Sequence, residues 1–174
     1  MPELAYQEQQ SFRYRWSYWL CLILTLLFVY GCWQQLLLQQ PFGSRPAPDL
    51  LLLLLSLLML TLLAALHFSS LELQLNEHGL AVRFLPLLNT WRRHHWQEIN
   101  SVKVISYSPI AEFGGWGIRG NKNYRCYSIS GNQGLKVQLK TGRVLLIGTQ
   151  QAAELNNWLA LQKSYLTVNT PNIE

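Results

Sequence analysis

Acidic residues and cysteines are scarce in this chain of 174 residues. Asp49 is its only aspartate, and the glutamates after residue 70 are spread singly, so no carboxylate pair suggests acid–base catalysis. The three cysteines, Cys21, Cys32 and Cys126, do not form a disulfide framework, and the four histidines have no recurring metal-ligand spacing. A Gly-x-Ser-x-Gly nucleophile motif is also missing. We therefore predict a protein that is not an enzyme and that holds no metal or cofactor.

Charge is missing along two apolar stretches. Residues 16–38 and 50–66 contain no Asp, Glu, Lys, Arg or His. As helices they would extend roughly 35 Å and 25 Å, close to the ~30 Å hydrocarbon layer of a bilayer. Because the remaining chain is too small to bury two such helices, we predict transmembrane helices over 16–38 and 50–68. A proline-rich external connector over 39–49 joins them. The first stretch is too long for a cleavable signal peptide.

Basic residues determine the predicted orientation. They flank the outer ends of the two helices, whereas the connector holds one arginine and one aspartate. The positive-inside rule then places both termini in the cytoplasm, in a multi-pass protein of a bacterial inner (plasma) membrane. The other predicted segments are a cytoplasmic tail over 1–15, a cytoplasmic β domain over 69–165 and a flexible tail over 166–174. The flanking basic residues are Arg13, Arg15, Arg83, Arg92 and Arg93.

After residue 70 the sequence is typical of a small β-rich domain. Eleven Lys and Arg against six Glu give this part the whole net charge of +5. Alternating apolar and polar residues predict about seven short antiparallel strands, at 71–75, 80–84, 90–96, 99–107, 124–130, 135–140 and 143–147. Thr149 is a suitable cap for an amphipathic helix that includes Leu155 and Trp158. We expect a small barrel or sandwich whose open end is closed by this C-terminal helix.

Three short motifs carry a resemblance to a known family. The run FGGWGIR at 113–119 is followed by a turn at 130–134 and by Leu-Ile-Gly-Thr-Gln at 146–150. In this order the motifs resemble the signature of an uncharacterised family among the bacterial pleckstrin-homology-like (PH-like) membrane proteins. The resemblance covers roughly residues 71–163. It implies a PH-like domain carried by two N-terminal transmembrane helices.

The glycine-rich loop is the first candidate site. Its glycines permit positive φ and close backbone approach, which suits an anionic ligand, a lipid headgroup or a docking partner. However, the loop lacks the Lys-Ser/Thr ending of a Walker loop. In the structural interpretation the loop is a tight connection in which Trp116 plugs the barrel and Arg119 pairs with Glu112 or a carbonyl. The candidate ligand or partner residues are Gly114, Gly115, Trp116, Gly117 and Arg119.

The second candidate is a basic patch made of Arg92, Arg93, His94 and His95. On a strand, Arg92 and His94 would share one face and Arg93 and His95 the other. Near an anionic leaflet each Lys or Arg contributes about 1 kcal/mol of attraction. Alternatively, the charges keep a solvated edge strand from aggregating. Nucleic acid is not an expected ligand, because the domain is held at the bilayer.

Two functions therefore remain open. The first is a non-catalytic, membrane-anchored PH-like scaffold module for protein assembly or inner-leaflet interaction. Its partners would be the lipid bilayer, anionic lipid headgroups, and a membrane protein or a second copy of the chain. The second is a small membrane enzyme or transporter accessory that binds an anionic ligand at the Gly114–Gly120 loop.

Overall fold

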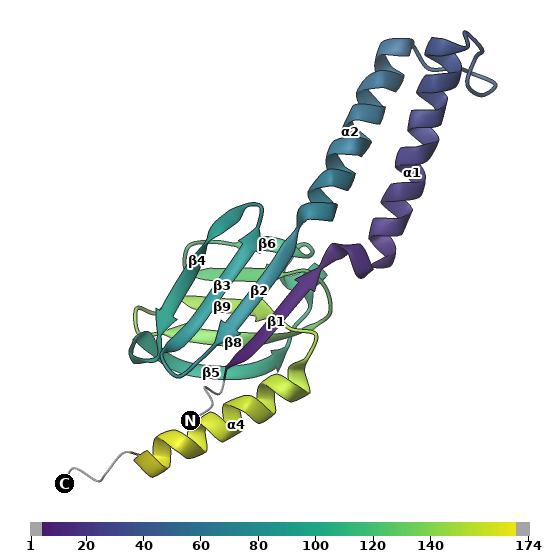
Figure 1. The fold of residues 1–174 in the computed structure, drawn as a ribbon. Coiled ribbons are helices and arrows are strands. Elements are labelled where there is room, and N and C mark those ends of the chain that lie inside the picture. The colour runs from purple at the N-terminus through teal and green to yellow at the C-terminus, as the bar shows by residue number, and fades with distance from the viewer. Residues whose placement is uncertain (1–4, 170–174) are drawn as a thin grey trace. The chain divides into compact units, whose positions relative to one another are not determined.

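The structure, a computed structural model, describes residues 5–169. These residues form two units (Figure 1). One is a helical unit comprising Ser11–Ser69. The other, here called the β domain, joins the N-terminal residues through Gln10 to the chain from Ser70 onward.

The helical unit confirms the two predicted apolar helices. A short 3-10 helix η1 (Phe12–Tyr14) precedes α1 (Trp16–Cys32), which continues as one π-helical stretch η2 (Trp33–Leu37); α2 spans Asp49–Phe68. Both helical segments are long and apolar enough to cross a membrane, with mean hydropathies of 1.8 and 2.6. Most of their side chains are exposed in the isolated chain.

Buried polar side chains connect α1 with α2. The Ser56 hydroxyl lies 3.1 Å from the Phe28 carbonyl of the other helix and 3.0 Å from Cys32 Sγ. The Thr25 hydroxyl lies 3.4 Å from the Met59 carbonyl. Between helices in an apolar environment such contacts stabilise association by about 0.6 kcal/mol each. They therefore support a paired hairpin of helices.

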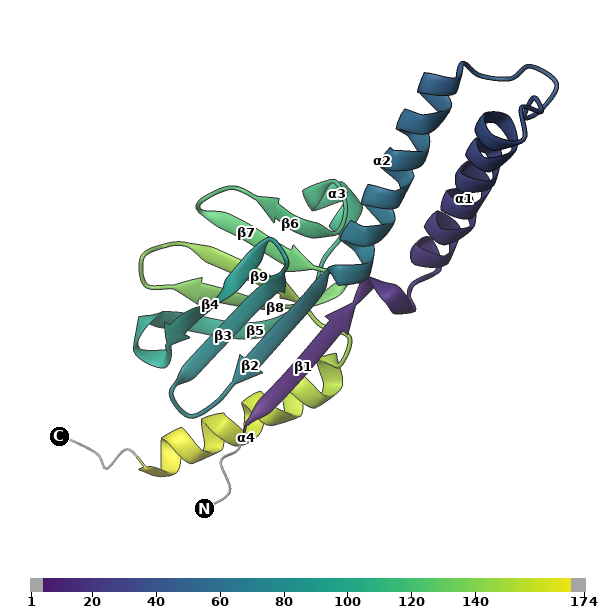
Figure 2. The same cartoon turned by 45° about the horizontal axis from the view of Figure 1, so that its top comes forward.

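Within the described residues, the β domain contains nine strands in two sheets (Figures 1 and 2). The first sheet has the order β1-β2-β3-β4 and comprises β1 (Tyr6–Ser11), β2 (Ser70–Leu75), β3 (Gly79–Leu85) and β4 (Leu88–His95). The second sheet has the order β5-β8-β9-β7-β6 and comprises β5 (Ile99–Ser106), β6 (Gly117–Gly120), β7 (Tyr124–Ser128), β8 (Gln133–Leu139) and β9 (Val144–Gly148). The neighbours β7 and β9 run parallel, so the expectation of antiparallel strands is wrong for this pair.

The predicted strands correspond to β2 to β5 and β7 to β9, and two strands were not predicted. β1 lies in the segment expected to be a tail, and β6 lies in the glycine-rich loop. The barrel form of the prediction is wrong for the described residues. β4 and β5 are separated by the 3-10 turn η3 (Trp96–Glu98) and belong to different sheets. The two sheets therefore do not join into a closed barrel.

The core lies between the sheets and is covered on one side by a helix. Alternate residues of the strands are buried there, and Leu155 of α4 (Ala152–Asn169) is buried with them. On the same helix, the Trp158 ring stacks on Trp96 with 6.3 Å between centroids. The C-terminal helix is thus confirmed and extends to Asn169, while residues 170–174 of the predicted tail lie outside the described residues. The buried strand residues include Leu71, Leu73, Leu75, Leu80, Val82, Phe84, Leu135, Val137, Leu146 and Ile147.

A buried carboxylate holds β1 in the β domain. Glu8 is only 4% exposed. It accepts hydrogen bonds from the Tyr6 hydroxyl (2.7 Å) and the Gln10 amide group (2.9 Å) on its own strand. It also accepts them from the Thr149 hydroxyl (2.6 Å) and the Gln150 backbone N–H (2.7 Å). These last two residues connect β9 with α4, so one side chain ties the N-terminal strand to the C-terminal part of the domain.

Candidate functional site

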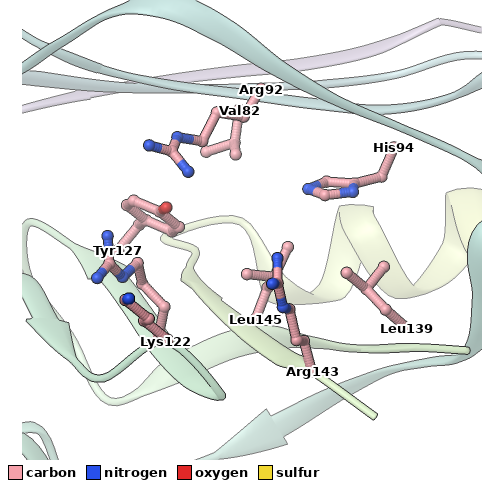
Figure 3. Close-up of a pocket in the computed structure, with 9 residues that line it drawn as sticks. Val82, Arg92, His94, Lys122, Tyr127, Leu139, Arg143 and Leu145 are labelled. Atoms are coloured by element: carbon pink, nitrogen blue, oxygen red, sulfur yellow. The ribbon is translucent and has the colours of Figure 1, made fainter. Parts of the chain in front are cut away.

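A cleft of about 380 Å³ lies between the two sheets (Figure 3). On one side are β3 and β4 of the first sheet. On the other are β7 and the turns that precede β7 and β9. These turns lie together because β7 and β9 are parallel neighbours, and the Val144 N–H donates to the Asn123 carbonyl at 2.7 Å. The topology therefore gathers residues distant in sequence around one opening.

The lining of the cleft is apolar at its base and cationic at its walls. The side chains of Val82, Tyr127 and Leu139 are buried. Four cationic side chains and one histidine surround them, and no carboxylate contributes to the lining. The complete lining is Val82, Arg92, His94, Lys122, Arg125, Tyr127, Leu139, Arg143 and Leu145.

The four cations of the cleft, Arg92, Lys122, Arg125 and Arg143, lack counterions in the described part of the chain. The ion pairs there join Glu77 to His78, Glu72 to Arg83 and Glu98 to His94. None of the four cations takes part in them or in a side-chain hydrogen bond between described residues. Like charges around one cleft repel each other, so a bound anion would relieve this repulsion.

His94 is the histidine of the cleft lining. Burial lowers the pKa of His94, and the nearby positive charge of Arg92 lowers it further. Glu98, whose Oε2 lies 3.7 Å from His94 Nδ1, acts in the opposite direction without reversing the shift. The ring is therefore neutral at pH 7 and can donate or accept one hydrogen bond.

The structure divides the predicted basic patch between the two faces of β4. Arg92 and His94 line the cleft, as the alternation along the strand predicts. Arg93 and His95 are exposed and do not line it. The sequence analysis did not single out Lys122, Arg125 or Arg143. The basic character of the turn before β7 was the available signal, but only the strand pairing shows that these residues meet Arg92.

In the glycine-rich loop, the side chains of Trp116 and Arg119 hydrogen-bond to backbone carbonyls. Gly114, with a φ of +69°, ends the short helix α3 (Pro109–Phe113), and β6 follows. The Trp116 indole N–H donates to the Gly131 carbonyl at 3.0 Å, and Arg119 Nε donates to the Trp116 carbonyl at 3.2 Å. The expectation that Trp116 plugs the core is wrong, because this residue is 39% exposed and lies at the surface.

The structural interpretation also offered Glu112 or a carbonyl as the partner of Arg119. Arg119 does pair with a carbonyl, whereas Glu112 accepts the Ser108 backbone N–H at 2.6 Å. None of Gly114, Gly115, Trp116, Gly117 and Arg119 lines the cationic cleft. The loop and the cleft are therefore separate features of the β domain.

No metal-binding cluster of three His, Cys, Asp or Glu side chains is found among the described residues. Cys126 is fully buried against Tyr107 and Leu146. Burial raises the pKa of its thiol, which disfavours the reactive thiolate. In comparisons with protein families, curated proteins and solved structures, nothing matches this chain.

Proposed function

We propose that this protein is a non-catalytic, membrane-anchored PH-like module whose β domain binds anionic headgroups of the inner leaflet of a bacterial plasma membrane. The observation that carries this proposal is the cluster of four cations in the cleft, none of which has a counterion within residues 5–169. The cluster belongs to a domain joined by its chain to two helices apolar enough to cross a bilayer.

The exposed surface of α2 supports a lipid environment. In the isolated chain this helix buries Leu52 and Ser56 and leaves leucines exposed along its whole length. Each exposed leucine would gain roughly 1.5–3 kcal/mol on moving from water into an apolar phase. A bilayer provides that phase over the length of both helices. The exposed leucines include Leu50, Leu53, Leu54, Leu57 and Leu58.

Strand pairing supports a hairpin with both ends on one side of the membrane. β1 precedes α1 in the chain and β2 follows α2, yet the two strands are neighbours in the same sheet. A sheet cannot form across a bilayer, so both ends of the hairpin must reach the same side. The arginines that flank the helices favour the cytoplasmic side.

The length of the tether supports action at the membrane surface. α2 ends at Phe68 and β2 begins at Ser70, so one residue joins them. One extended residue spans at most about 3.6 Å. This is less than the Debye length of about 8 Å in physiological salt, so the start of β2 is held where the leaflet's charge acts.

The PH-like assignment rests on the three sequence motifs. A role in assembly, with a membrane protein or a second copy as partner, is the other version of this function. The alternative of an enzyme or transporter accessory at the glycine-rich loop gains no specific support, because Arg119 is bonded within the loop.

Amide hydrogen exchange of the full chain in lipid nanodiscs tests the proposal. Discs of phosphatidylcholine alone are compared with discs that also contain phosphatidylglycerol. We expect slower exchange at residues 121–123 and 140–143 in the anionic discs at low salt. The difference should shrink as salt shortens the Debye length. Identical exchange in both discs at low salt would refute the lipid function and leave protein partners.

A further inference from the structure

We infer that the cleft is a discrete site for one doubly charged phosphate group, and that it prefers a phosphomonoester over a phosphodiester. This inference rests on the proposed function and names its ligand class. The alternative within the same function is diffuse attraction of a basic surface to an anionic one.

The positions of the cations favour a discrete site. Figure 3 shows Arg92 and His94 reaching the cleft from the first sheet, and Lys122 and Arg143 reaching it from the opposite side. Arg125, on β7, completes the set. A flat basic surface would present its charges in one direction. Here they converge on a single cleft, which suits one compact anion.

The charge of the cleft favours a dianion. Four cations line it and no carboxylate does. A phosphomonoester carries about −1.5 to −2 charges at pH 7 and offers three acceptor oxygens. A phosphodiester carries a single negative charge, and two of its oxygens are taken up in ester bonds. Three of the four cations are arginines, whose planar groups match phosphate oxygens in pairs.

Neutral donors complete the site. The Tyr127 hydroxyl is directed toward the space between the sheets (Figure 3). His94 is uncharged and adjoins Arg92. Both can hydrogen-bond a phosphate oxygen without adding charge, while Leu139 and Leu145 limit the water around it.

The size of the cleft limits what accompanies the phosphate. Its volume of about 380 Å³ lies at the lower end for small-molecule sites. It suits a phosphate together with a glycerol or sugar, and it does not suit acyl chains. The ligand is therefore either the headgroup of a lipid whose chains remain in the bilayer or a free phosphomonoester of similar size.

Native mass spectrometry of the full chain in nonionic detergent tests this inference. The three probes are phosphatidic acid, phosphatidylglycerol and glycerol 3-phosphate. We expect one phosphatidic acid per chain, bound at least about tenfold more tightly than phosphatidylglycerol, because a dianion satisfies more of the charge-assisted bonds. Glycerol 3-phosphate should compete for the site. Competition at equal affinity assigns the site to a free ligand, and weaker competition assigns it to a lipid.

Two neighbouring residues of β4 provide a matched pair of variants. Arg92→Gln removes a charge that lines the cleft, and Arg93→Gln removes the same charge from outside it. We expect Arg92→Gln to weaken phosphatidic acid binding at least about tenfold and Arg93→Gln to leave it unchanged. Arg143→Gln, in an exposed turn, provides a second cleft variant. Circular dichroism verifies that each variant is folded.

The outcomes separate this inference from the function on which it rests. Equal loss in Arg92→Gln and Arg93→Gln, or equal affinity for both lipids, overturns the discrete site and leaves diffuse leaflet attraction in place. Absence of binding to either lipid, together with unchanged exchange in anionic nanodiscs, overturns the proposed function as well.

Discussion

Replacing Glu8 with alanine removes the carboxylate that holds β1 in the β domain. Glu8 accepts four hydrogen bonds, two within β1 and two from the connection between β9 and α4. We expect this substitution to destabilise the domain and to release β1 first, because β1 is an edge strand with a single neighbour in its sheet.

The cost follows from the donors that lose their partner. Gln10 keeps a bond to a backbone carbonyl at 2.7 Å, and Tyr6 lies 3.5 Å from a glutamine oxygen. The Gln150 N–H has no other acceptor among the described residues, whereas the buried Thr149 hydroxyl still accepts the Gln151 N–H at 3.1 Å and adjoins Tyr6. A donor left unsatisfied in the protein interior costs about 1–3 kcal/mol, and Gln150 lies at the surface, so we expect a loss of about 1–3 kcal/mol in total. This is a measurable part of the ~5–15 kcal/mol that stabilises a typical domain.

Urea unfolding of the full chain in detergent, followed by circular dichroism, measures this loss. Gln9→Ala is the matched control, because Gln9 lies on the same strand with an exposed side chain. It should change the free energy of unfolding by no more than ~0.5 kcal/mol. Hydrogen exchange should speed up in residues 6–11 for Glu8→Ala only. Equal unfolding midpoints for the two variants would refute this account of how β1 is held.

Three further predictions use the same unfolding assay. Trp158→Ala should lower the free energy of unfolding by about 3–5 kcal/mol, because Trp158 is 7% exposed. Trp116→Ala should lower it by roughly 1–2 kcal/mol, because Trp116 lies at the surface, and equal losses would contradict this. Gly120→Ala should destabilise the domain more than Gly142→Ala. Both glycines have positive φ, but of the two only Gly120 would place a Cβ against a backbone carbonyl, that of Tyr124. Equal effects would argue against that close approach. Burial holds the pKa of His94 below its usual 6.5, so the unfolded chain binds the proton more readily than the folded chain. The free energy of unfolding should therefore fall as pH drops below about 6.5. His94→Gln should flatten this fall, and an unchanged pH profile would contradict it.

The sequence was sufficient to predict the helices and strands whose buried face is uniformly apolar. The two charge-free runs become α1 continued by η2, which together end at Leu37, and α2, with bounds within a residue or two. The alternation of Leu71, Leu73 and Leu75 gives β2, and Leu80, Val82 and Phe84 give β3 in the same way. In each case the periodicity in sequence matches the face that is buried.

The elements that were missed lack this signal. β1 buries Glu8 and Gln10, so its inward face is polar and its alternation is not one of hydrophobicity. β6 is four residues long and begins and ends with glycine. In both, hydrogen bonding to the rest of the domain outweighs the weak local preference for a strand.

The candidate site was predicted only in part, for a related reason. The alternation along β4 correctly placed Arg92 and His94 on one face. Their partners Lys122 and Arg143 come from two later turns and Arg125 comes from β7, and the parallel pairing of β7 with β9 brings these turns together. Such pairing depends on how the whole domain folds, and no local pattern contains it.

The place of β1 in the chain has a consequence for how the protein is made. The hairpin of α1 and α2 is an insertion within the β domain, since the ribosome completes the first strand before either helix and its neighbour β2 only after both. At about 5–20 residues per second, the first strand waits several seconds for its partner. A fragment that starts at residue 70 would lack this strand and expose the edge of β2 to aggregation. Insertion of the hairpin and completion of the domain are thus steps of one folding process.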